Sequence, residues 1–189
     1  MQVRRDHFPR QQRQLVMPAT LPNIPRVQSL KVHGVTISNS QSATEHVNRV
    51  ISSSAQSIHA LRLLRSHGMT NASLHIIYRA VVVAKLTYAA SAWWVFTTAA
   101  DRQRLEAVIR RAKRTYLCSS DLPSLAELVD SSDDTLFNSI LSNPHHVLHS
   151  TLPKQTVFSY GLGRRRHNRE HLNKSSCLVQ SCFFVRYVV

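Results

Sequence analysis

The amino-acid sequence predicts a mainly α fold: a helical bundle preceded by a short β segment and followed by a basic, partly disordered C-terminal tail. The first observation is the stretch 70–92, where apolar residues fall on nearly every side of a helix and few charges interrupt them. The second is a pair of flanking segments, 42–67 and 99–117, whose apolar residues recur with helical spacing. The third is residues 27–37, where apolar and polar residues alternate as in a strand.

The stretch 70–92 is expected to be the central helix. Thr70 is placed to be its N-cap, because a threonine hydroxyl accepts a hydrogen bond from a free N–H of the first turn. Apolar residues on most sides of the helix predict burial on most sides: Leu74, Ile76, Ile77, Tyr78, Val81, Val82, Val83, Leu86, Tyr88 and Ala89. The rival interpretation is a membrane span, but a span needs about 20 largely uncharged residues, and Arg79 and Lys85 interrupt the stretch.

The segments before the central helix predict one strand and one helix. Residues 26–38 favour a strand because five of them are β-branched, and Gly34 within it indicates a bulge or a close backbone approach. Residues Ser42 to Glu45 match the S-x-x-E capping box, which predicts that a helix opens there. Gly68 is placed to end that helix as its first residue beyond the C-cap.

A third helix is expected over 99–117, with basic residues on the side away from its apolar face. The apolar face is formed by Leu105, Val108, Ile109, Ala112 and Tyr116. The basic residues are Arg102, Arg104, Arg110, Arg111, Lys113 and Arg114. Two short helices should follow, one starting within 121–128 and another running from Asp133 or Asp134 to Leu141, ended by Asn143 and Pro144.

The chain of 189 residues is long enough for one domain of moderate size. Its segments are an irregular basic arm (1–25), a strand (26–38), a three-helix bundle (39–117), short helices (118–150) and a basic tail of doubtful order (151–189).

The charge of the chain points to a polyanionic partner. There are 24 Lys and Arg residues against 10 Asp and Glu, which gives a formal net charge of +14. Arginine predominates, and its planar guanidinium suits bidentate contact with phosphate. The alternatives are a merely soluble basic surface and a ribosomal-type scaffold role. Only four glycines are present, and neither phosphate-binding glycine motif occurs.

Three cysteines do not make an even disulfide framework, so we expect a reduced, intracellular protein of the nucleus or cytoplasm. The charged N-terminus is not followed by the apolar segment of a secretory signal, which favours a protein that is not secreted.

Seven sequence motifs occur in an order that resembles one family. They are IPRVQSLKVHGVTI (24–37), TEHV (44–47), LRLLRSHGM (61–69), IYRAVVVAKLTYAASAWW (77–94), DRQRLEAVIRRA (101–112), SNPHHVLH (142–149) and RRRHNR (164–169). Together they resemble the C-terminal part of the reverse transcriptase of LINE-type (non-LTR) retrotransposons, of the Jockey-like, tick-transposon kind. The resemblance covers residues 24–189. Two departures are His33, where the family usually has leucine, and the segment 160–164.

The resemblance implies a fragment of an RNA-directed DNA polymerase. The strand would be the last of the palm, and the helices would form the thumb, which grips an RNA–DNA or DNA duplex template–primer made on retrotransposon RNA. The family's catalytic motif, an aromatic residue followed by Ala-Asp-Asp, should precede Leu30 and does not occur in this chain. We therefore expect no catalytic residue, no cofactor and no small-molecule substrate in the fragment, and no polymerase activity by itself; Mg²⁺ is expected for the full-length polymerase.

Nucleic-acid contact is expected from the basic residues of the first helix, the third helix and the tail. The candidates are Arg62, Arg65, Arg102, Arg110, Arg111, Lys113, Arg114, Arg164, Arg165 and Arg166. The alternative without nucleic-acid binding is a solvated basic face on which Glu106 forms an ion pair with Arg110 one turn away. Trp93 and Trp94 are expected to pack in the core rather than stack on bases.

No metal site is expected. Asp133 and Asp134 precede a helical pattern, so they are interpreted as N-terminal capping residues and not as a polymerase metal pair. His145, His146 and His149 are interpreted as part of a turn. A zinc site built from tail residues is the weaker alternative to a basic loop with cysteines in an apolar tail; its ligands would be His167, His171, Cys177 and Cys182.

A second functional hypothesis is a non-functional retrotransposon relic or a basic helical interaction module without catalysis. The apolar faces of residues 32–37 and of the tail would then be exposed and adhesive. No membrane partner is expected.

Overall fold

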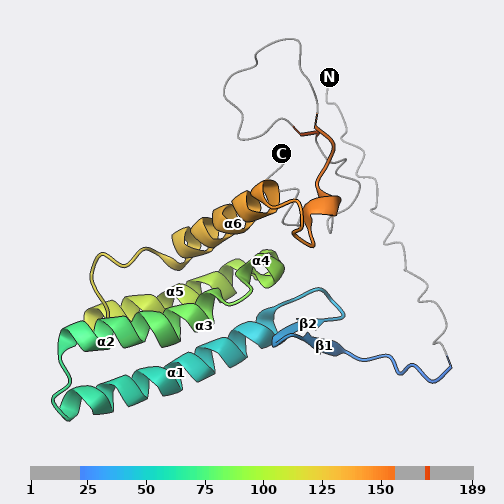
Figure 1. Ribbon diagram of the computed structural model, residues 1–189. Helices are drawn as coiled ribbons and strands as arrows, with labels where there is room; N and C mark the ends of the chain where they lie inside the picture. The colour runs from blue at the N-terminus through green and yellow to red at the C-terminus, as the bar shows by residue number, and fades with distance from the viewer. Residues whose placement is uncertain (1–21, 156–168, 171–189) are drawn as a thin grey trace, which may run out of the picture.

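The computed structural model describes residues 22–155 and 169–170, and the chain is mainly helical (Figure 1). In chain order the elements are β1 (Ser29–Val32), β2 (Val35–Ser38), α1 (Thr44–Ser66), α2 (Asn71–Tyr78), the π-helical segment η1 (Arg79–Val83), α3 (Ala84–Thr87), α4 (Ala90–Trp93), the 3₁₀ turn η2 (Trp94–Phe96), α5 (Ala99–Arg114), α6 (Leu125–Ser142) and the 3₁₀ turn η3 (His149–Thr151). The predicted fold class, helices preceded by a short β segment, is confirmed.

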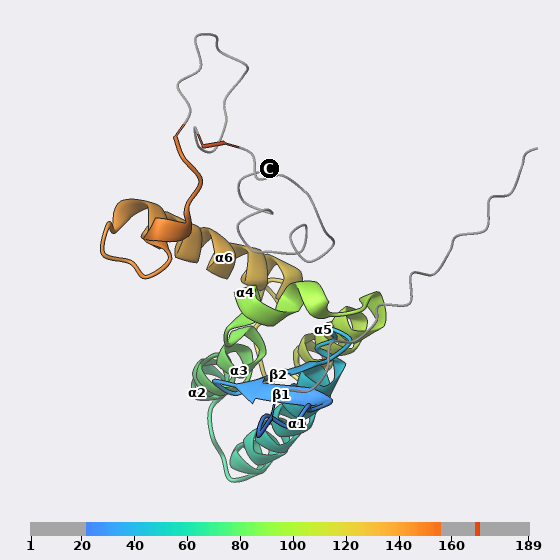
Figure 2. The ribbon, with the colours of Figure 1, turned by 90° about the vertical axis from the view of Figure 1, so that its right-hand side faces the viewer.

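The helices pack in layers around one main core, and Phe137 and Ile140 in the second half of α6 form a separate small cluster with the segment that follows. α1 and α6 lie on opposite sides of the α2–α3 segment, and α5 packs against both α1 and α6 (Figure 1 and Figure 2). α1 and α5 run in the same direction, because Thr44 contacts Asp101 near their starts and Arg65 contacts Thr115 near their ends. The largest fully buried side chains of this core include Trp93, Tyr78 and Leu105.

The β segment is a hairpin and not the single strand that the sequence predicted. β1 and β2 pair antiparallel, with Val32 opposite Val35. His33 and Gly34 form the two-residue turn, and both have positive φ, 47° and 86°. This is the geometry of a type I′ turn, which glycine favours in its second position. Gly34 therefore serves the turn and not a bulge, and His33 is exposed.

The start of α1 differs from the prediction, and its end agrees with it. Ala43 is the N-cap, while Ser42 lies one residue earlier and accepts from the N–H of Thr44, so the expected capping box does not form. At the other end Gly68 has a φ of 92°, and its N–H donates to the carbonyl of Arg65. Gly68 is thus the residue beyond the C-cap, as predicted.

The central helix is interrupted and is covered on fewer sides than expected. Thr70 caps α2 as predicted, since its hydroxyl accepts from the N–H of Ser73. Ala89 has a φ of 50°, which ends the helix after α3. Burial on most sides is contradicted by Ile76, which is 71% exposed, and by Tyr88, at 56%. Apolar content alone therefore overstated the burial of this stretch.

After α5 the chain forms one long helix and not two short ones. Ser124 and Glu127 make a reciprocal capping box at the start of α6. Asp133 was interpreted as an N-terminal capping residue, but it lies in the middle of α6 and is fully buried. Its carboxylate accepts a short hydrogen bond from the hydroxyl of Ser91 in α4. The buried partner makes a mid-helix aspartate tolerable, which no local pattern revealed. α6 ends at Asn143, as predicted.

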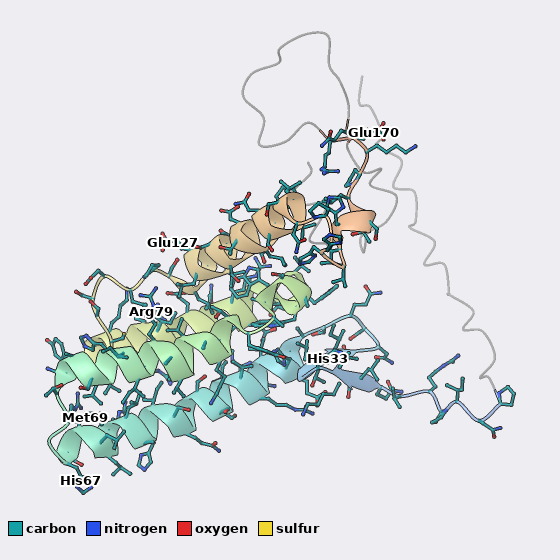
Figure 3. The ribbon with its side chains drawn as sticks, in the orientation of Figure 1. His33, His67, Met69, Arg79, Glu127 and Glu170 are labelled. Atoms are coloured by element: carbon teal, nitrogen blue, oxygen red, sulfur yellow. The ribbon has the colours of Figure 1, made fainter. Side chains whose placement is uncertain are left out.

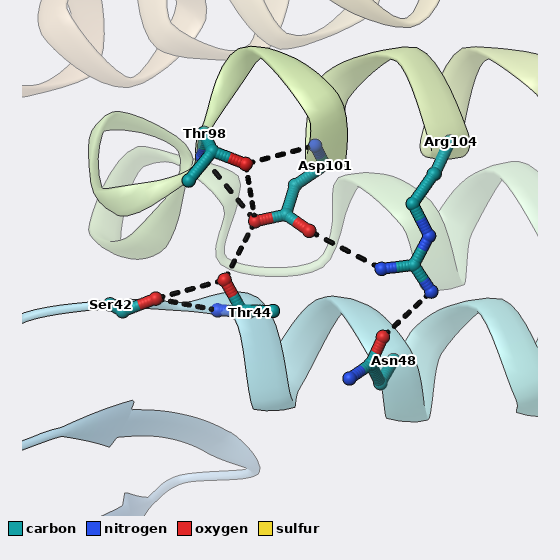
Figure 4. A network of polar contacts seen from close by, with 6 residues as sticks. All are labelled: Ser42, Thr44, Asn48, Thr98, Asp101 and Arg104. Carbon is teal, nitrogen blue, oxygen red and sulfur yellow. Dashed lines mark hydrogen bonds and ion pairs between the residues drawn. The ribbon is translucent and has the colours of Figure 1, made fainter.

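The starts of α1 and α5 are joined by a polar network centred on Asp101 (Figure 4). Oδ2 of Asp101 accepts from the hydroxyl of Thr44 at 2.8 Å and from the hydroxyl of Thr98 at 2.9 Å. Oδ1 faces Nη1 of Arg104 at 3.4 Å, and Nη2 of Arg104 donates to Asn48 at 2.7 Å. Asp101 is 3% exposed, so its charge depends on these donors.

Replacing Asp101 with asparagine should weaken this joint. Burial raises the pKa of Asp101, but the hydrogen bonds from Thr44 and Thr98 and the charge of Arg104 outweigh it and lower that pKa. A lowered pKa in the folded state means that the stabilisation is present above the unfolded pKa of about 3.9 and is lost as pH falls through the folded value. We expect Asp101→Asn to cost about 1.5–3 kcal/mol at neutral pH.

The measurement is urea unfolding as a function of pH. The difference between the wild type and Asp101→Asn should shrink in acid, because the wild-type carboxyl is then protonated. Asp121→Asn, at an exposed carboxylate, is the matched control and should change stability less. A difference that does not depend on pH would contradict a role for the charge.

Candidate nucleic-acid interface

Five of the candidate arginines lie where α1 and α5 both end; we call this surface the basic end. It consists of Arg62, Arg65, Arg110, Arg111 and Arg114. The two helix ends are in contact, since Nη1 of Arg65 donates to the carbonyl oxygen of Thr115 at 2.5 Å. The link from α1 to α2, marked by His67 and Met69, is at this end of the bundle, opposite the hairpin turn at His33 (Figure 3).

The side chains of the basic end are exposed and carry uncompensated charge. All five arginines are exposed, and within the described residues none of them forms an ion pair. Part of this arrangement is structural, because a cation in the last turn of a helix interacts favourably with the helix dipole, typically by about 0.3–1 kcal/mol. Five positive charges gathered at one end of the bundle nevertheless repel, which favours an anion bound over them.

The arginines of α5 spread around the helix. Arg111 lies two turns after Arg104, which contacts Asn48, so Arg111 is on the side of α5 that faces α1. Arg110 and Arg114 are four residues apart and share the side away from the core. The basic end is therefore a curved surface that runs from α1 across the exposed side of α5.

Arg102 and Lys113 have other contacts. The guanidinium of Arg102 lies 5.0 Å from the ring centroid of Trp94 and donates from Nε to the hydroxyl of Thr97 at 2.9 Å. Arg102 precedes Arg114 by 12 residues, which corresponds to about 18 Å along α5 at 1.5 Å per residue. Nζ of Lys113 donates to the carbonyl oxygen of Leu122 at 2.6 Å. Both side chains thus make contacts within the fold: Arg102 lies far from the basic end, and Lys113, although in the last turn of α5, is directed to Leu122.

The alternative for α5 was a solvated basic face with an ion pair between Glu106 and Arg110, and that pair does not form among the described residues. The carboxylate of Glu106 instead accepts from the N–H of Leu125 at 2.8 Å, at the start of α6. Trp93 and Trp94 are 0% and 6% exposed, which confirms the prediction that they pack in the core. The arginine candidates of the tail, Arg164 to Arg166, lie outside the described residues.

Among the described residues no group of three or more His, Cys, Asp or Glu side chains could hold a metal ion. Asp133 is buried on a helix and Asp134 is exposed, so the two do not form the strand–turn–strand pair of a polymerase. His145 and His146 occupy the predicted turn after Asn143. The four residues of the alternative zinc site, which are His167, His171, Cys177 and Cys182, lie outside the described residues.

A shallow cavity of about 580 Å³ lies between η2, α5 and the start of α6. Its lining includes Trp94, Arg102, Glu106 and Asp130. Its charged lining residues are one arginine and two carboxylates, so the cavity does not offer the positive charge that a polyanion requires. It lies beside the first turns of α5, away from the basic end.

One polar contact was not predicted from the sequence, and one tyrosine contradicts the prediction. Nζ of Lys85 is partly buried between α3 and α1, where the hydroxyls of Ser53 and Ser57 accept from it at 2.8 and 3.0 Å. The run of serines in α1 was the available signal, because serine is unusual within a long helix unless its hydroxyl has a partner. Tyr116 was expected on the apolar face of the third helix, but α5 ends at Arg114 and Tyr116 is 73% exposed, with a φ of 54°.

Within the described residues, no helix combines the length and the apolar character that crossing a bilayer requires. No family model matches the chain, and neither a curated protein nor a solved structure matches it.

Proposed function

We propose that this chain binds a nucleic-acid duplex through the basic end, as the thumb-like part of a retrotransposon reverse transcriptase that does not polymerise by itself. The observation that carries the proposal is the group of five exposed arginines without ion pairs at the common end of α1 and α5. The partner class is an RNA–DNA or DNA duplex template–primer and, with it, retrotransposon RNA.

Phosphate contact is the chemistry that these side chains support. A guanidinium donates two parallel hydrogen bonds to one phosphate, and each contact releases counterions from the duplex. Such contacts give affinity and orientation without reading bases. The net charge of +14 adds long-range attraction to the same partner.

The link to a reverse transcriptase rests on the ordered sequence motifs. The resemblance implies a β segment followed by helices, and the chain has this order, although the β segment is a hairpin instead of the single strand expected. The catalytic motif of that family, an aromatic residue followed by Ala-Asp-Asp, does not occur in this chain, and the buried carboxylates of Asp101 and Asp133 accept hydrogen bonds from hydroxyl groups. Two-metal chemistry requires carboxylates that face a shared site, so the proposed role is to hold the duplex.

Removing the exposed charge of α5 should flatten the salt dependence of binding. We expect the triple variant Arg110→Gln, Arg111→Gln and Arg114→Gln to bind a DNA duplex more weakly. If each arginine neutralises one phosphate, the slope of log affinity against log salt should fall by about 2.7, at about 0.9 per contact. Fluorescence anisotropy with a labelled duplex at several salt concentrations measures this slope.

The matched control is Arg102→Gln, which removes one charge from the same helix but from the contact with Trp94. It should lower the melting temperature and leave the slope nearly unchanged. An unchanged slope in the triple variant, or an equal effect in the control, would contradict the assignment of the basic end.

A primed RNA or DNA template with Mg²⁺ and nucleotides tests the expected lack of catalysis. The chain should bind the template and extend no primer, because the catalytic motif of the polymerase family does not occur in its sequence. Primer extension is read directly on a denaturing gel. Extension by the purified chain would overturn this part of the proposal.

A second candidate, an interaction module, is favoured by one observation on the hairpin. Leu30 and Val32 of β1 are 59% and 51% exposed, although their partners Ile37 and Val35 on β2 pack against the core. If this face binds protein, the wild type should self-associate in sedimentation velocity and Leu30→Ser with Val32→Ser should be monomeric. A monomeric wild type with a cooperative thermal transition would count against it.

A further inference from the structure

Tyr116 occupies a backbone position that suits glycine. It follows Thr115, the C-cap of α5, and its φ is 54°. Its N–H donates to the carbonyl of Lys113, and the N–H of Leu117 donates to the carbonyl of Ala112, both at 3.0 Å. This pair of bonds is the Schellman motif, whose left-handed residue is usually glycine because a Cβ is strained there.

The same motif ends α1, and there the left-handed residue is Gly68, with a φ of 92°. At the end of α1 the fold therefore uses a glycine, which adopts the left-handed conformation without strain. A bulky residue with positive φ is a conformational outlier, and such outliers gather at functional sites. A tyrosine at the same position after α5 is strained, so its presence there calls for an explanation.

Packing does not supply that reason. The side chain of Tyr116 is 73% exposed, whereas the next residues, Leu117 and Cys118, turn into the core. Tyr88 is also exposed, but its hydroxyl donates to the carbonyl of His33 at 3.2 Å and its ring lies against Gly34. Among the described residues Tyr116 has no side-chain hydrogen bond, so its ring is presented to solvent.

The surroundings of Tyr116 are cationic. Arg65 is fixed beside it by the hydrogen bond to Thr115, and Arg111 and Arg114 lie in the last turn of α5. An aromatic face among guanidinium groups matches the two parts of a nucleotide, because the base stacks on the ring and the phosphates face the cations.

We propose that Tyr116 stacks on an unpaired base at the end of the nucleic acid bound by the basic end. This inference rests on the proposed function and adds a preference to it. The protein should favour a duplex that carries a single-stranded overhang over a blunt duplex. A base inside a duplex offers no free face, so only an unpaired base fits the exposed ring.

The test compares three DNA duplexes, one blunt, one with a short overhang and one with the same overhang made abasic. We expect the wild type to bind the intact overhang more tightly than the other two. Tyr116→Gly should lose that advantage, by about 5- to 150-fold for one stacked base, and should bind all three duplexes alike. Tyr116→Trp, which keeps an aromatic face, should retain the preference.

Stability separates this role from a structural one. Tyr116→Gly relieves the left-handed strain, so its melting temperature should rise by roughly 2–4 °C while its preference for the overhang is lost. Tyr88→Ala is the matched control, because it removes an exposed tyrosine that has a structural contact. It should melt at a lower temperature and keep the preference for the overhang.

The outcomes distinguish the two proposals. Tyr116→Gly with the wild-type ratio between intact and abasic overhangs would overturn the stacking role and leave the basic end intact. A lower melting temperature together with an equal loss on all three duplexes would also overturn it, since the loss would then be structural. Binding of no duplex by the wild type would overturn the proposed function and, with it, this inference.

Discussion

The hydrogen bonds around Asp101 are the constraint on which the arrangement of the bundle depends. They tie the first turn of α1 to the first turn of α5, across 57 positions of sequence. Because both helices start from this joint and run in the same direction, they also finish together. The arginines near the two C-terminal ends are thereby brought into one surface. A buried acid at one end of the bundle thus determines where the positive charge gathers at the other end.

The helices themselves could be predicted from local sequence, and the corrections share one physical origin. Thr70 and Gly68 act through hydrogen bonds to residues within one or two turns, so their roles were visible in the sequence. Asp133 acts through Ser91, which is 42 positions away, and a local pattern cannot contain such a partner. The hairpin was not predicted because apolar and polar residues alternate on both sides of His33 and Gly34, and the whole segment therefore has the pattern of one strand. Ala89 has no sequence signal for positive φ at all.

The same reasoning explains how much of the candidate site was predictable. Helical spacing identifies which arginines face away from the core, and Arg110, Arg111 and Arg114 are exposed as the spacing of α5 implies. Spacing does not say which neighbours an exposed side chain meets. Arg102 meets Trp94, and Lys113 meets the carbonyl of Leu122, so both are directed to structural contacts. The contact of Arg65 with the end of α5 depends on the tertiary packing of two helices, so it could not be predicted from the sequence.

The π-helical segment η1 corrects the phase of the central helix. The four fully buried residues Leu74, Tyr78, Val82 and Leu86 are spaced by four. In a regular α-helix each such step overshoots one turn by about 40°, so Leu86 would be rotated by about 120° from Leu74 and would leave the core. The wider turn over Arg79–Val83 takes up the excess and keeps the apolar line straight between α1 and α6. Apolar residues that recur at every fourth position of a helix can therefore indicate a π-helical turn.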